Sequence, residues 1–262
     1  MRYQKEAKLG FSILVYVLAW GSIVYYLDFF TGFYVPKTVD QGVEWPWIIA
    51  LIWDLLLLLG LGLLLEMTRK ADFQAQIPAG LDRSFQLLMY VLALVFLVSL
   101  WRPINGVIYD LRDHAMATVF SGCYYWGWWM CLTATFLIDH WSRFGVRQPL
   151  NLLSKPESMR ATALKTPLLY LLVRHPVYLG MIIFHFSTPY MSIGRLLLAV
   201  GITYFLLRQI ELDETQLLKQ FGDRYRAYQQ KVPKILPWQR AHQSEFVRPQ
   251  NLFSILEEPF EV

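Results

Sequence analysis

The stretch from Trp47 to Leu65, WIIALIWDLLLLLGLGLLL, decides the fold class of this chain. It is almost wholly apolar and contains five consecutive leucines, Leu55 to Leu59. A helix needs roughly 20 mainly apolar residues to cross a bilayer, so this stretch predicts a membrane-spanning helix. The composition agrees, because only 17% of the residues are charged, whereas soluble domains carry about 25%.

Five further apolar stretches accompany the first, so the chain has six candidate spans. The others are Leu9–Phe30, Phe85–Trp101, Thr118–Ile138, Pro167–Tyr190 and Ile193–Ile210. Charged residues interrupt the last two, and their connection is very short. The sequence therefore predicts an all-α, polytopic membrane helical bundle of five to six spans. The first apolar run is longer than the roughly 7–15 residues of a signal-peptide core and no typical cleavage site follows it, so we expect it to be retained.

Basic residues predict the orientation, because Lys and Arg concentrate in the cytoplasmic loops of membrane proteins. Eleven lie in the N-terminus and in the loops after the second and fourth spans, against four in the alternate loops. We therefore expect both termini in the cytoplasm. The net charge of +4 then reflects topology, and it does not indicate binding of nucleic acid. The pattern predicts no oligomeric state.

Changes in composition divide the chain into three segments. Residues 1–150 form a transmembrane front half, which a polar connection carrying Pro156 separates from the rest. Residues 151–238 hold the last apolar stretches and a polar amphipathic helix, which Pro233 and Pro237 terminate. Residues 239–262 form a tail with little pattern.

The fourth candidate span carries two cysteines and an aromatic run. Cys123 and Cys131 are eight residues apart on one helix, which is about 12 Å along its axis and too far for a disulfide. No spacing typical of a zinc site occurs. The run from Tyr124 to Trp129 surrounds Gly127, which fits either helix packing at the glycine or the lining of an apolar substrate pocket.

Ionisable residues next to the apolar stretches are the candidates for chemistry, because such residues are costly in a membrane. Arg174 and His175 precede Pro176, where a new helix would expose N–H groups suited to an anion. Arg174 adds a fork for a carboxylate. Asp213 and Glu214 follow the sixth stretch, where an acid can pair with the amine or ribose of a nucleoside cofactor. The plainer interpretations are a headgroup anchor for the first pair and a helix emerging into water for the second.

The order of these motifs resembles the isoprenylcysteine carboxyl methyltransferase superfamily. Arg-His-Pro-x-Tyr-x-Gly at 174–180 comes first, then the acidic pair, then Phe-Gly-x-x-Tyr-x-x-Tyr at 221–228 and Val-Pro-x-x-x-Pro at 232–237. The resemblance implies that residues 151–238 bind S-adenosylmethionine on the cytoplasmic side, without a metal. The cofactor-binding residues that it implies are Arg174, His175, Tyr178, Gly180 and Glu214. Asp213 stands where the family usually has a Glu.

The front half is similar to bacterial methanethiol S-methyltransferases, which convert methanethiol to dimethyl sulfide. The similar stretches include LWRPINGVIYD at 100–110 and TFLIDHWSRFGVRQ at 135–148. The resemblance implies an enzyme of the bacterial inner membrane that methylates a small apolar thiol arriving from the bilayer. His140 and Arg174 are then the catalytic candidates: His140, or a water it holds, would take the thiol proton, and a cation would favour the thiolate. His140 equally fits an interface histidine bonded to a headgroup or a loop carbonyl.

One departure leaves the acceptor open. The family carries a Gln-His pair near the cytoplasmic end of the second span, where this chain has Leu63-Leu64-Leu65, followed by Glu66 and Arg69. A lipid, isoprenoid or prenylcysteine-type acceptor therefore stays an alternative. A non-catalytic membrane accessory protein is a further alternative, against which the intact 174–180 motif and Glu214 argue.

Overall fold

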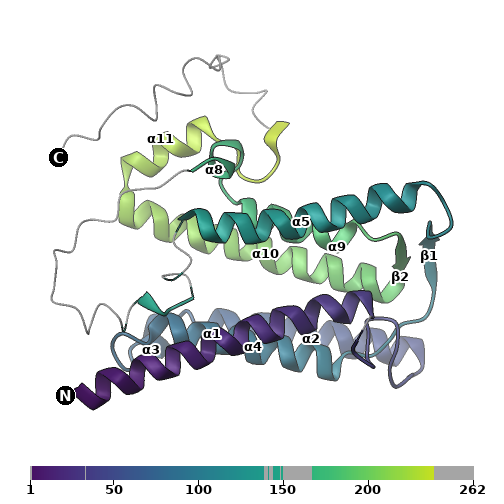
Figure 1. The fold of residues 1–262 in the computed structure, drawn as a ribbon, viewed down its shortest axis with the longest axis horizontal. Coiled ribbons are helices and arrows are strands. Elements are labelled where there is room, and N and C mark those ends of the chain that lie inside the picture. Colours follow the sequence, from purple (N-terminus) through teal and green to yellow (C-terminus); the bar gives the residue numbers. More distant parts are fainter. Residues whose placement is uncertain are drawn as a thin grey trace.

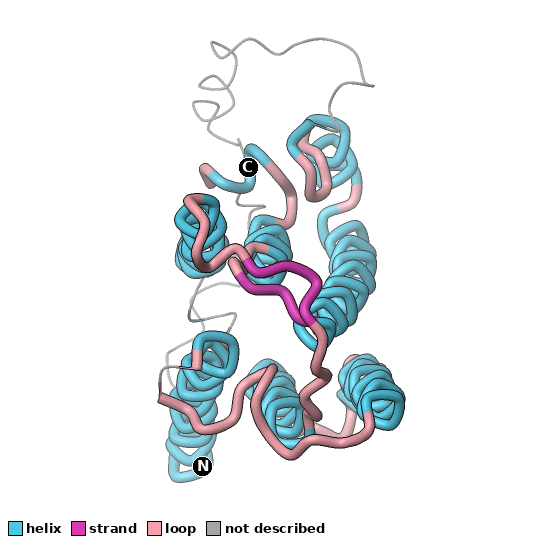
Figure 2. Tube along the Cα trace, turned by 90° about the vertical axis from the view of Figure 1, so that its right-hand side faces the viewer, coloured by secondary structure: helices cyan, strands magenta, loops and turns pink. Residues whose placement is uncertain are grey.

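A computed structural model of the chain describes residues 2–32, 34–138, 141, 144–147, 149 and 167–238. Its longer helices lie in two layers (Figures 1 and 2). One layer consists of α1 (Arg2–Thr31), α2 (Trp47–Met67) and α4 (Asp82–Leu100), and the other of α5 (Met116–Ile138), α9 (Pro176–Phe186) and α10 (Ile193–Phe221). Within the layers α1 packs on α4 and α5 packs on α9, while α10 contacts both α9 and α2 and so joins the two. The one-turn helix α3 (Ala71–Gln74) connects α2 to α4.

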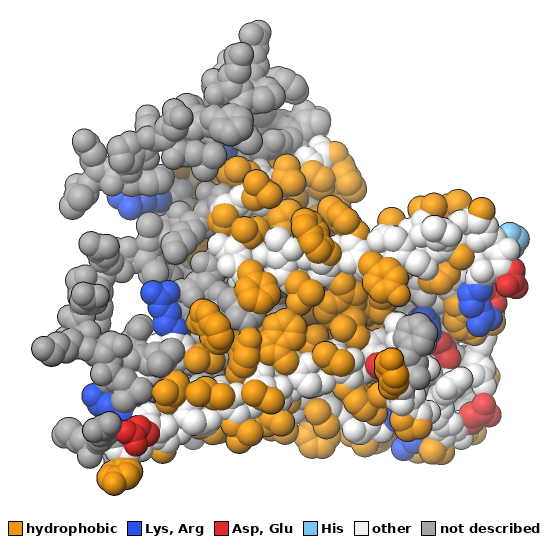
Figure 3. All heavy atoms as spheres, in the orientation of Figure 1, with side chains coloured by type: hydrophobic (Ala, Val, Ile, Leu, Met, Phe, Trp, Pro, Cys, Tyr) orange, Lys and Arg blue, Asp and Glu red, His pale blue; other side chains and the backbone are white. Residues whose placement is uncertain are grey.

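Four of the described helices are long and apolar enough to cross a membrane. They are residues 5–31 of α1 and the whole of α2, α4 and α10. Large apolar side chains such as Val17, Leu56 and Tyr204 are exposed on their surfaces. In Figure 3 apolar side chains cover the middle of the visible face, and charged side chains gather toward its two ends. An apolar band of this extent matches a lipid surface better than water. The aromatic-rich α5 has 23 residues but is not among the four.

The structure corrects the prediction of a continuous fifth span from Pro167 to Tyr190. The first part is a single turn, α8 (Leu169–Leu172), and α9 begins only at Pro176 and has 11 residues. Proline lacks an N–H and disfavours a helical conformation in the preceding residue, and His175 accordingly has φ −125° and ψ 63°. Eleven residues rise about 16 Å as a helix, against about 30 Å of hydrocarbon. Thus α9 is too short to span a bilayer.

The described part of the chain is mostly helical, as the sequence predicts, and a short β-ribbon is added to the helices. Strand β1 (Val107–Asp110) pairs antiparallel with β2 (Tyr190–Ser192), and the ribbon lies at one end of the molecule in Figure 1 and faces the viewer in Figure 2. The ribbon ties the connection between α4 and α5 to the turn between α9 and α10. Ser192 then caps α10, because its side chain accepts a hydrogen bond from the backbone N–H of Arg195.

The polar segment after Ile210 continues the last apolar helix. Helix α10 runs without a break to Phe221, so its apolar part and its acidic residues share one rigid element. Gly222, at φ +54°, ends it in the left-handed region that favours glycine. Helix α11 (Asp223–Lys231) follows and buries Tyr225. In Figure 1 α11 lies at the same end of the molecule as the N-terminus, opposite the ribbon.

Candidate active site

Two residues that precede α9 converge on Glu214 of α10. Nε and Nη2 of Arg174 lie 2.9 Å and 2.8 Å from Oε1 of Glu214, and Nε2 of His175 lies 3.2 Å from the same oxygen. Lys234 brings its Nζ to 3.6 Å from Oε2. The side chains of Arg174, His175 and Glu214 are only 7–12% exposed. The 174–180 motif and the acidic pair predicted from the sequence are therefore brought together, and they form a largely enclosed charged cluster.

The segment after α11 holds the backbone in front of α9. The N–H of Arg174 donates to the carbonyl of Pro233 at 2.9 Å, and the N–H of His175 donates to the carbonyl of Lys234 at 3.2 Å. These bonds explain the position of the Val-Pro motif, whose extended backbone fixes the two residues that reach Glu214. They also replace the helical hydrogen bonds that Pro176 prevents.

Arg174 uses all three of its guanidinium nitrogens within the protein. Besides the contacts with Glu214, Nη1 donates to the carbonyls of Gln229 and Val232 at 2.9 Å and 2.6 Å. The sequence predicts a carboxylate fork at this residue, and the carboxylate that it contacts is Glu214. The two carbonyls lie at the C-terminal end of α11. In this structure Arg174 thus joins α10, α11 and the start of α9.

A second polar group lies beside the first, around Asp213. The hydroxyl of Tyr178 donates to Oδ2 of Asp213 at 2.6 Å, and Nη2 of Arg69 donates to Oδ1 at 2.9 Å. The phenol of Tyr90 on α4 lies near Arg69. Nε and Nη1 of Arg69 are buried and have no hydrogen-bond partner among the described residues. This group joins the two layers of helices.

Arg69 and Lys234 also belong to this site, although the sequence did not predict them there. Arg69 follows α2 and is 144 residues away from Asp213, so only the packing of the two layers brings them together. In the sequence, Arg69 is only a basic residue just after an apolar stretch, and membrane topology alone accounts for a basic residue at that place. Leu63 and Leu64, where the family's Gln-His pair is expected, are exposed on α2.

Gly180 lies in the contact between α5 and α9. A Cβ on Gly180 would be 2.6 Å from the carbonyl oxygen of Gly127, and a Cβ on Gly127 would be 2.7 Å from the carbonyl oxygen of Gly180. Neither backbone has room for a side chain there. The packing interpretation of Gly127 is confirmed. In this structure the close approach at Gly180 is that of a neighbouring helix.

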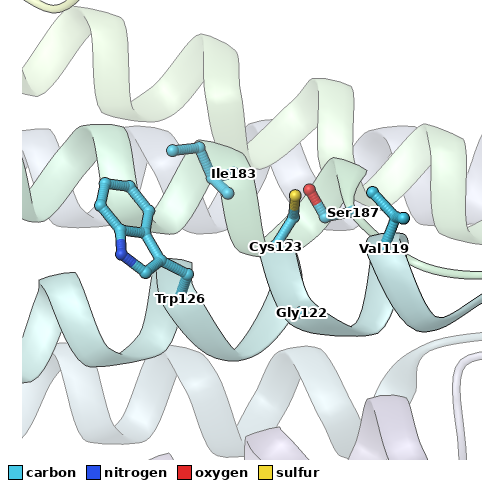
Figure 4. Close-up of a pocket in the computed structure, with 6 residues that line it drawn as sticks. All are labelled: Val119, Gly122, Cys123, Trp126, Ile183 and Ser187. Atoms are coloured by element: carbon cyan, nitrogen blue, oxygen red, sulfur yellow. The ribbon is translucent and has the colours of Figure 1, made fainter.

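The aromatic run also borders a groove between α5 and α9. Val119, Gly122, Cys123 and Trp126 of α5 face Ile183 of α9 and Ser187, which follows α9, around a volume of about 590 Å³ (Figure 4). The lining is mostly apolar, and Trp126 is half exposed. The groove lies beside the Gly127 contact, on the part of α5 that leads toward the ribbon.

Two further predictions from the sequence concern His140 and the two cysteines of α5. His140 lies outside the described residues. The cysteines Cys123 and Cys131 are both free. Among the residues that the structure describes, no group of three or more His, Cys, Asp or Glu side chains is placed to hold a metal ion.

Curated proteins related to this chain match it over most of its length. Methanethiol S-methyltransferase 1 of Bradyrhizobium diazoefficiens is 34% identical over 235 residues, which are 88% of this chain and 82% of that protein. The chain belongs to the methanethiol S-methyltransferase family. Another member, the methanethiol S-methyltransferase of Mycobacterium tuberculosis, is 33% identical over 235 residues, 88% of this chain and 95% of that protein. The family resemblance predicted from the motifs is confirmed.

A more distant relative is named for a different acceptor. The protein-S-isoprenylcysteine O-methyltransferase of Schizosaccharomyces pombe is 34% identical over 72 residues, 26% of this chain and 30% of that protein. No family model matches the chain, and no solved structure matches it.

The tyrosines of α11 complete the site in this member of the methanethiol S-methyltransferase family. The rings of Tyr225 and Tyr228 are 5.8 Å apart, and the hydroxyl of Tyr228 donates to the carbonyl of Tyr170 at 2.5 Å. Burial raises the pKa of the Tyr225 phenol, and the negative charge of Glu214 raises it further. Both effects keep this phenol neutral. The charged cluster thus has an uncharged aromatic wall beside it.

Proposed function

We propose that this chain is a membrane-embedded, S-adenosylmethionine-dependent methyltransferase that converts methanethiol to dimethyl sulfide. The observation that carries the proposal is the convergence of Arg174, His175 and Lys234 on Glu214, beside the pair of Tyr178 and Asp213. The names of the relatives supply the acceptor. The motif order from residue 174 to residue 237 supplies the donor.

The residues at the site fit the chemical groups of S-adenosylmethionine. The carboxylates of Asp213 and Glu214 suit its amine and its ribose hydroxyls. Its carboxylate suits Lys234, which is 39% exposed, or the N-terminus of α9, where free N–H groups favour an anion. Tyr225 and Tyr228 offer aromatic faces to the adenine. In addition, two buried donors of Arg69 have no partner among the described residues, which supports a site that a ligand completes.

The residues predicted from the sequence divide into two roles in this proposal. His175, Tyr178 and Glu214 bind the cofactor. Arg174 positions Glu214, since its nitrogens are already used, and Gly180 positions α9 by letting it approach α5. The cofactor-binding region 151–238 therefore depends on contacts with the front half of the chain, residues 1–150.

The bound cofactor supplies an activated methyl group on a sulfonium sulfur. The chain must hold the thiol in line with that methyl group, keep water out and remove the thiol proton. The low exposure of His175 and Glu214 supports the exclusion of water. We assign the proton to His140 or to a water that it holds. Retained turnover in a His140→Ala variant would remove this role.

The proposal puts both termini and the Glu214 cluster on the cytoplasmic side. The excess of basic residues in the corresponding loops supports this orientation. The methyl donor is a polar molecule and reaches the site from the aqueous phase. A small apolar thiol can dissolve in the bilayer, which gives a reason for the enzyme to reside in a membrane.

Headspace gas chromatography of the purified protein in detergent, with S-adenosylmethionine and methanethiol, tests the proposal. We expect dimethyl sulfide from the native protein and from Glu211→Gln, whose acid is 59% exposed and pairs with Arg208. We expect none from Glu214→Gln. Methylation of N-acetyl-S-farnesylcysteine instead of methanethiol would contradict the acceptor and favour the relative from Schizosaccharomyces pombe. Failure to bind S-adenosylhomocysteine in calorimetry would contradict the proposal that the chain is an S-adenosylmethionine-dependent enzyme.

A further inference from the structure

Arg69 differs from two other enclosed arginines in the use of its donors. Arg174 and Arg195 engage all three guanidinium nitrogens with protein acceptors. Arg69 engages Nη2 with Asp213, but its Nε and Nη1 are buried without a partner in the described part of the chain. A buried donor without an acceptor costs about 1–3 kcal/mol, and more when it is charged. Such a group calls for a specific explanation.

A second unpaired polar side chain lies one helical turn from this ion pair. Gln209 precedes Asp213 by four residues on α10, so the two share a face of the helix. Gln209 is 2% exposed, and neither atom of its amide has a hydrogen-bond partner among the residues described. Gln209 is also closer than Asp213 to the apolar part of α10. Unused hydrogen-bonding groups thus lie beside Asp213, on Arg69, and one helical turn nearer the apolar part of α10, on Gln209.

We propose that Arg69 and Gln209 bind the sulfur of the methyl acceptor and that Arg69 stabilises it as the thiolate. The inference rests on the proposed function and deepens it. A cysteine thiol has a pKa of about 8.5 and a simple alkanethiol is less acidic, so the acceptor is mostly protonated at neutral pH, whereas the thiolate is the nucleophile. A neighbouring guanidinium lowers the pKa of a thiol. Arg174 has no nitrogen left for this task, and Lys234 lies on the other acidic residue, Glu214.

The chemistry balances without a further reactant. The thiol gives its proton to the base or to water and becomes a thiolate, which Arg69 holds through N–H donation while it stays protonated. The thiolate sulfur then forms a bond to the methyl carbon as the bond from that carbon to the sulfonium sulfur breaks. The electron pair of the broken bond stays on the leaving sulfur, which gives dimethyl sulfide and S-adenosylhomocysteine.

A guanidinium also binds a carboxylate, and the methyl donor carries one. The position favours the thiolate, because Gln209 extends the site toward the apolar part of α10, the side from which a bilayer-soluble thiol arrives. The carboxylate of the donor has Lys234, which contacts Glu214 and not Asp213. The experiment therefore measures donor binding and thiol ionisation separately.

The experiment compares Arg69→Met and Arg69→Lys with the matched control Arg208→Met. Arg208 lies in the same interface of α2 and α10, with its Nε 3.6 Å from Glu66, but it is 46% exposed and outside the site. Calorimetry gives the affinity for S-adenosylhomocysteine. The ultraviolet absorbance of the thiolate, followed against pH in the dead-end complex with S-adenosylhomocysteine and methanethiol, gives the pKa of the bound thiol. Turnover against pH gives kcat/KM.

We expect Arg69→Met to bind S-adenosylhomocysteine like the native protein but to ionise the bound thiol only at higher pH. Its kcat/KM at neutral pH falls by about 100-fold, the usual effect of losing one stabilising donor. The loss shrinks as the pH rises or when a thiol of lower pKa, such as a fluorinated ethanethiol, is the acceptor. Arg69→Lys keeps a cation beside Asp213, so the pKa of its bound thiol should lie between those of the native protein and of Arg69→Met. Arg208→Met behaves like the native protein.

Four results would overturn the inference. A large loss of S-adenosylhomocysteine affinity with unchanged thiol ionisation would mean that Arg69 holds the carboxylate of the donor. Equal losses in Arg69→Met and Arg208→Met would mean a structural role only. Native turnover in Arg69→Met would refute the inference and leave the proposed function intact, whereas a native protein that binds S-adenosylhomocysteine but neither ionises nor methylates methanethiol would refute the acceptor as well.

Discussion

Arg195 and Arg69 make the same kind of ion pair at opposite ends of the molecule, with opposite outcomes for their remaining donors. Arg195 pairs with Asp40 at 2.7 Å and Arg69 pairs with Asp213 at 2.9 Å, and each arginine side chain is 14% exposed. Arg195 gives its other two nitrogens to Thr188 and to the carbonyl of Phe30. Arg69 gives its other two to no described residue. The two arginine side chains are therefore equally buried, but only Arg195 has a described hydrogen-bond partner for each of its three nitrogens.

The difference distinguishes the network around Arg195, which holds the ribbon end together, from the network around Arg69, which lies beside the Glu214 cluster. Around Arg195, Asp40 also accepts from Ser192, which joins the loop after α1 to the ribbon and to α10. This network is complete without a ligand. Around Arg69 and Gln209, polar groups are left without partners, which a folded protein retains only at a cost. We therefore expect changes at the first end to alter stability alone, and changes at the second to alter ligand binding, with or without a loss of stability.

Glu214→Gln is the most damaging change that we predict at the functional end. It leaves the positive charge of Arg174 buried without its carboxylate, and removing one partner of such a pair costs about 3 kcal/mol of unfolding free energy. We also expect the affinity for S-adenosylhomocysteine to fall by about 100-fold. Denaturation and calorimetry in detergent measure the two effects. The control Glu211→Gln removes an exposed acid and should change stability by less than about 0.5 kcal/mol. Native affinity in Glu214→Gln would remove the acid from the cofactor site.

Arg195→Met changes the ribbon end of the molecule. We expect it to lower stability without changing ligand affinity. Asp40 loses its cation and Thr188 loses a donor, so we expect the unfolding free energy to fall by about 3 kcal/mol. The affinity of the folded fraction for S-adenosylhomocysteine should not change, since the site lies at the other end. Arg112→Met is the matched control: Arg112 pairs with Asp110 but is 60% exposed, and such pairs contribute about 0–1 kcal/mol. If folded Arg195→Met lost its affinity, the two ends would not be independent.

The contrast also explains which parts of the fold could be predicted from the sequence. Long apolar runs mark helices with little ambiguity, and the stretch predicted from Trp47 to Leu65 is observed as Trp47–Met67. The run from Pro167 to Tyr190 is equally apolar, but Pro176 and the backbone bonds of residues 174–175 to the segment after α11 interrupt it. Apolar content predicts burial in lipid, whereas these interruptions depend on local backbone chemistry and on a partner segment about 60 residues away.

The candidate site divides in the same way. Arg174, His175 and Glu214 were predicted together because their motifs occur in a recognisable order, and the structure brings them within hydrogen-bond distance. Arg69 could not be predicted as their neighbour, because its position depends on how the two helix layers pack. The unused donors of Arg69 are likewise a property of the packed structure, since the sequence gives no measure of hydrogen-bond satisfaction.

Gly127→Ala should have an intermediate effect, through the packing of α5 on α9. The added Cβ would lie 2.7 Å from the carbonyl oxygen of Gly180 and 2.9 Å from the N–H nitrogen of Phe184, both backbone atoms. The helices must move apart, and overpacking of this kind costs about 1–3 kcal/mol. Gly122→Ala is the control on the same helix, because its Cβ would meet nothing within 4 Å. It should stabilise the helix by up to about 1 kcal/mol. Equal stability of the two variants would show that the glycine contact is not tight.

Gln209→Leu has the smallest predicted effect. It tests whether the unpaired amide of Gln209 binds the acceptor or is a structural group. Leucine removes a buried amide that has no partner, and such a replacement is nearly neutral or stabilising, so we expect unfolding free energy to change by less than about 1 kcal/mol. If the amide contacts the acceptor, kcat/KM for methanethiol falls by about fivefold, which corresponds to about 1 kcal/mol. S-adenosylhomocysteine affinity stays constant. Gln216→Leu, on the exposed side of α10, should leave kcat/KM unchanged. Clear destabilisation by Gln209→Leu would instead make the amide a structural group like those around Arg195, and the difference between the two ends would then rest on Arg69 alone.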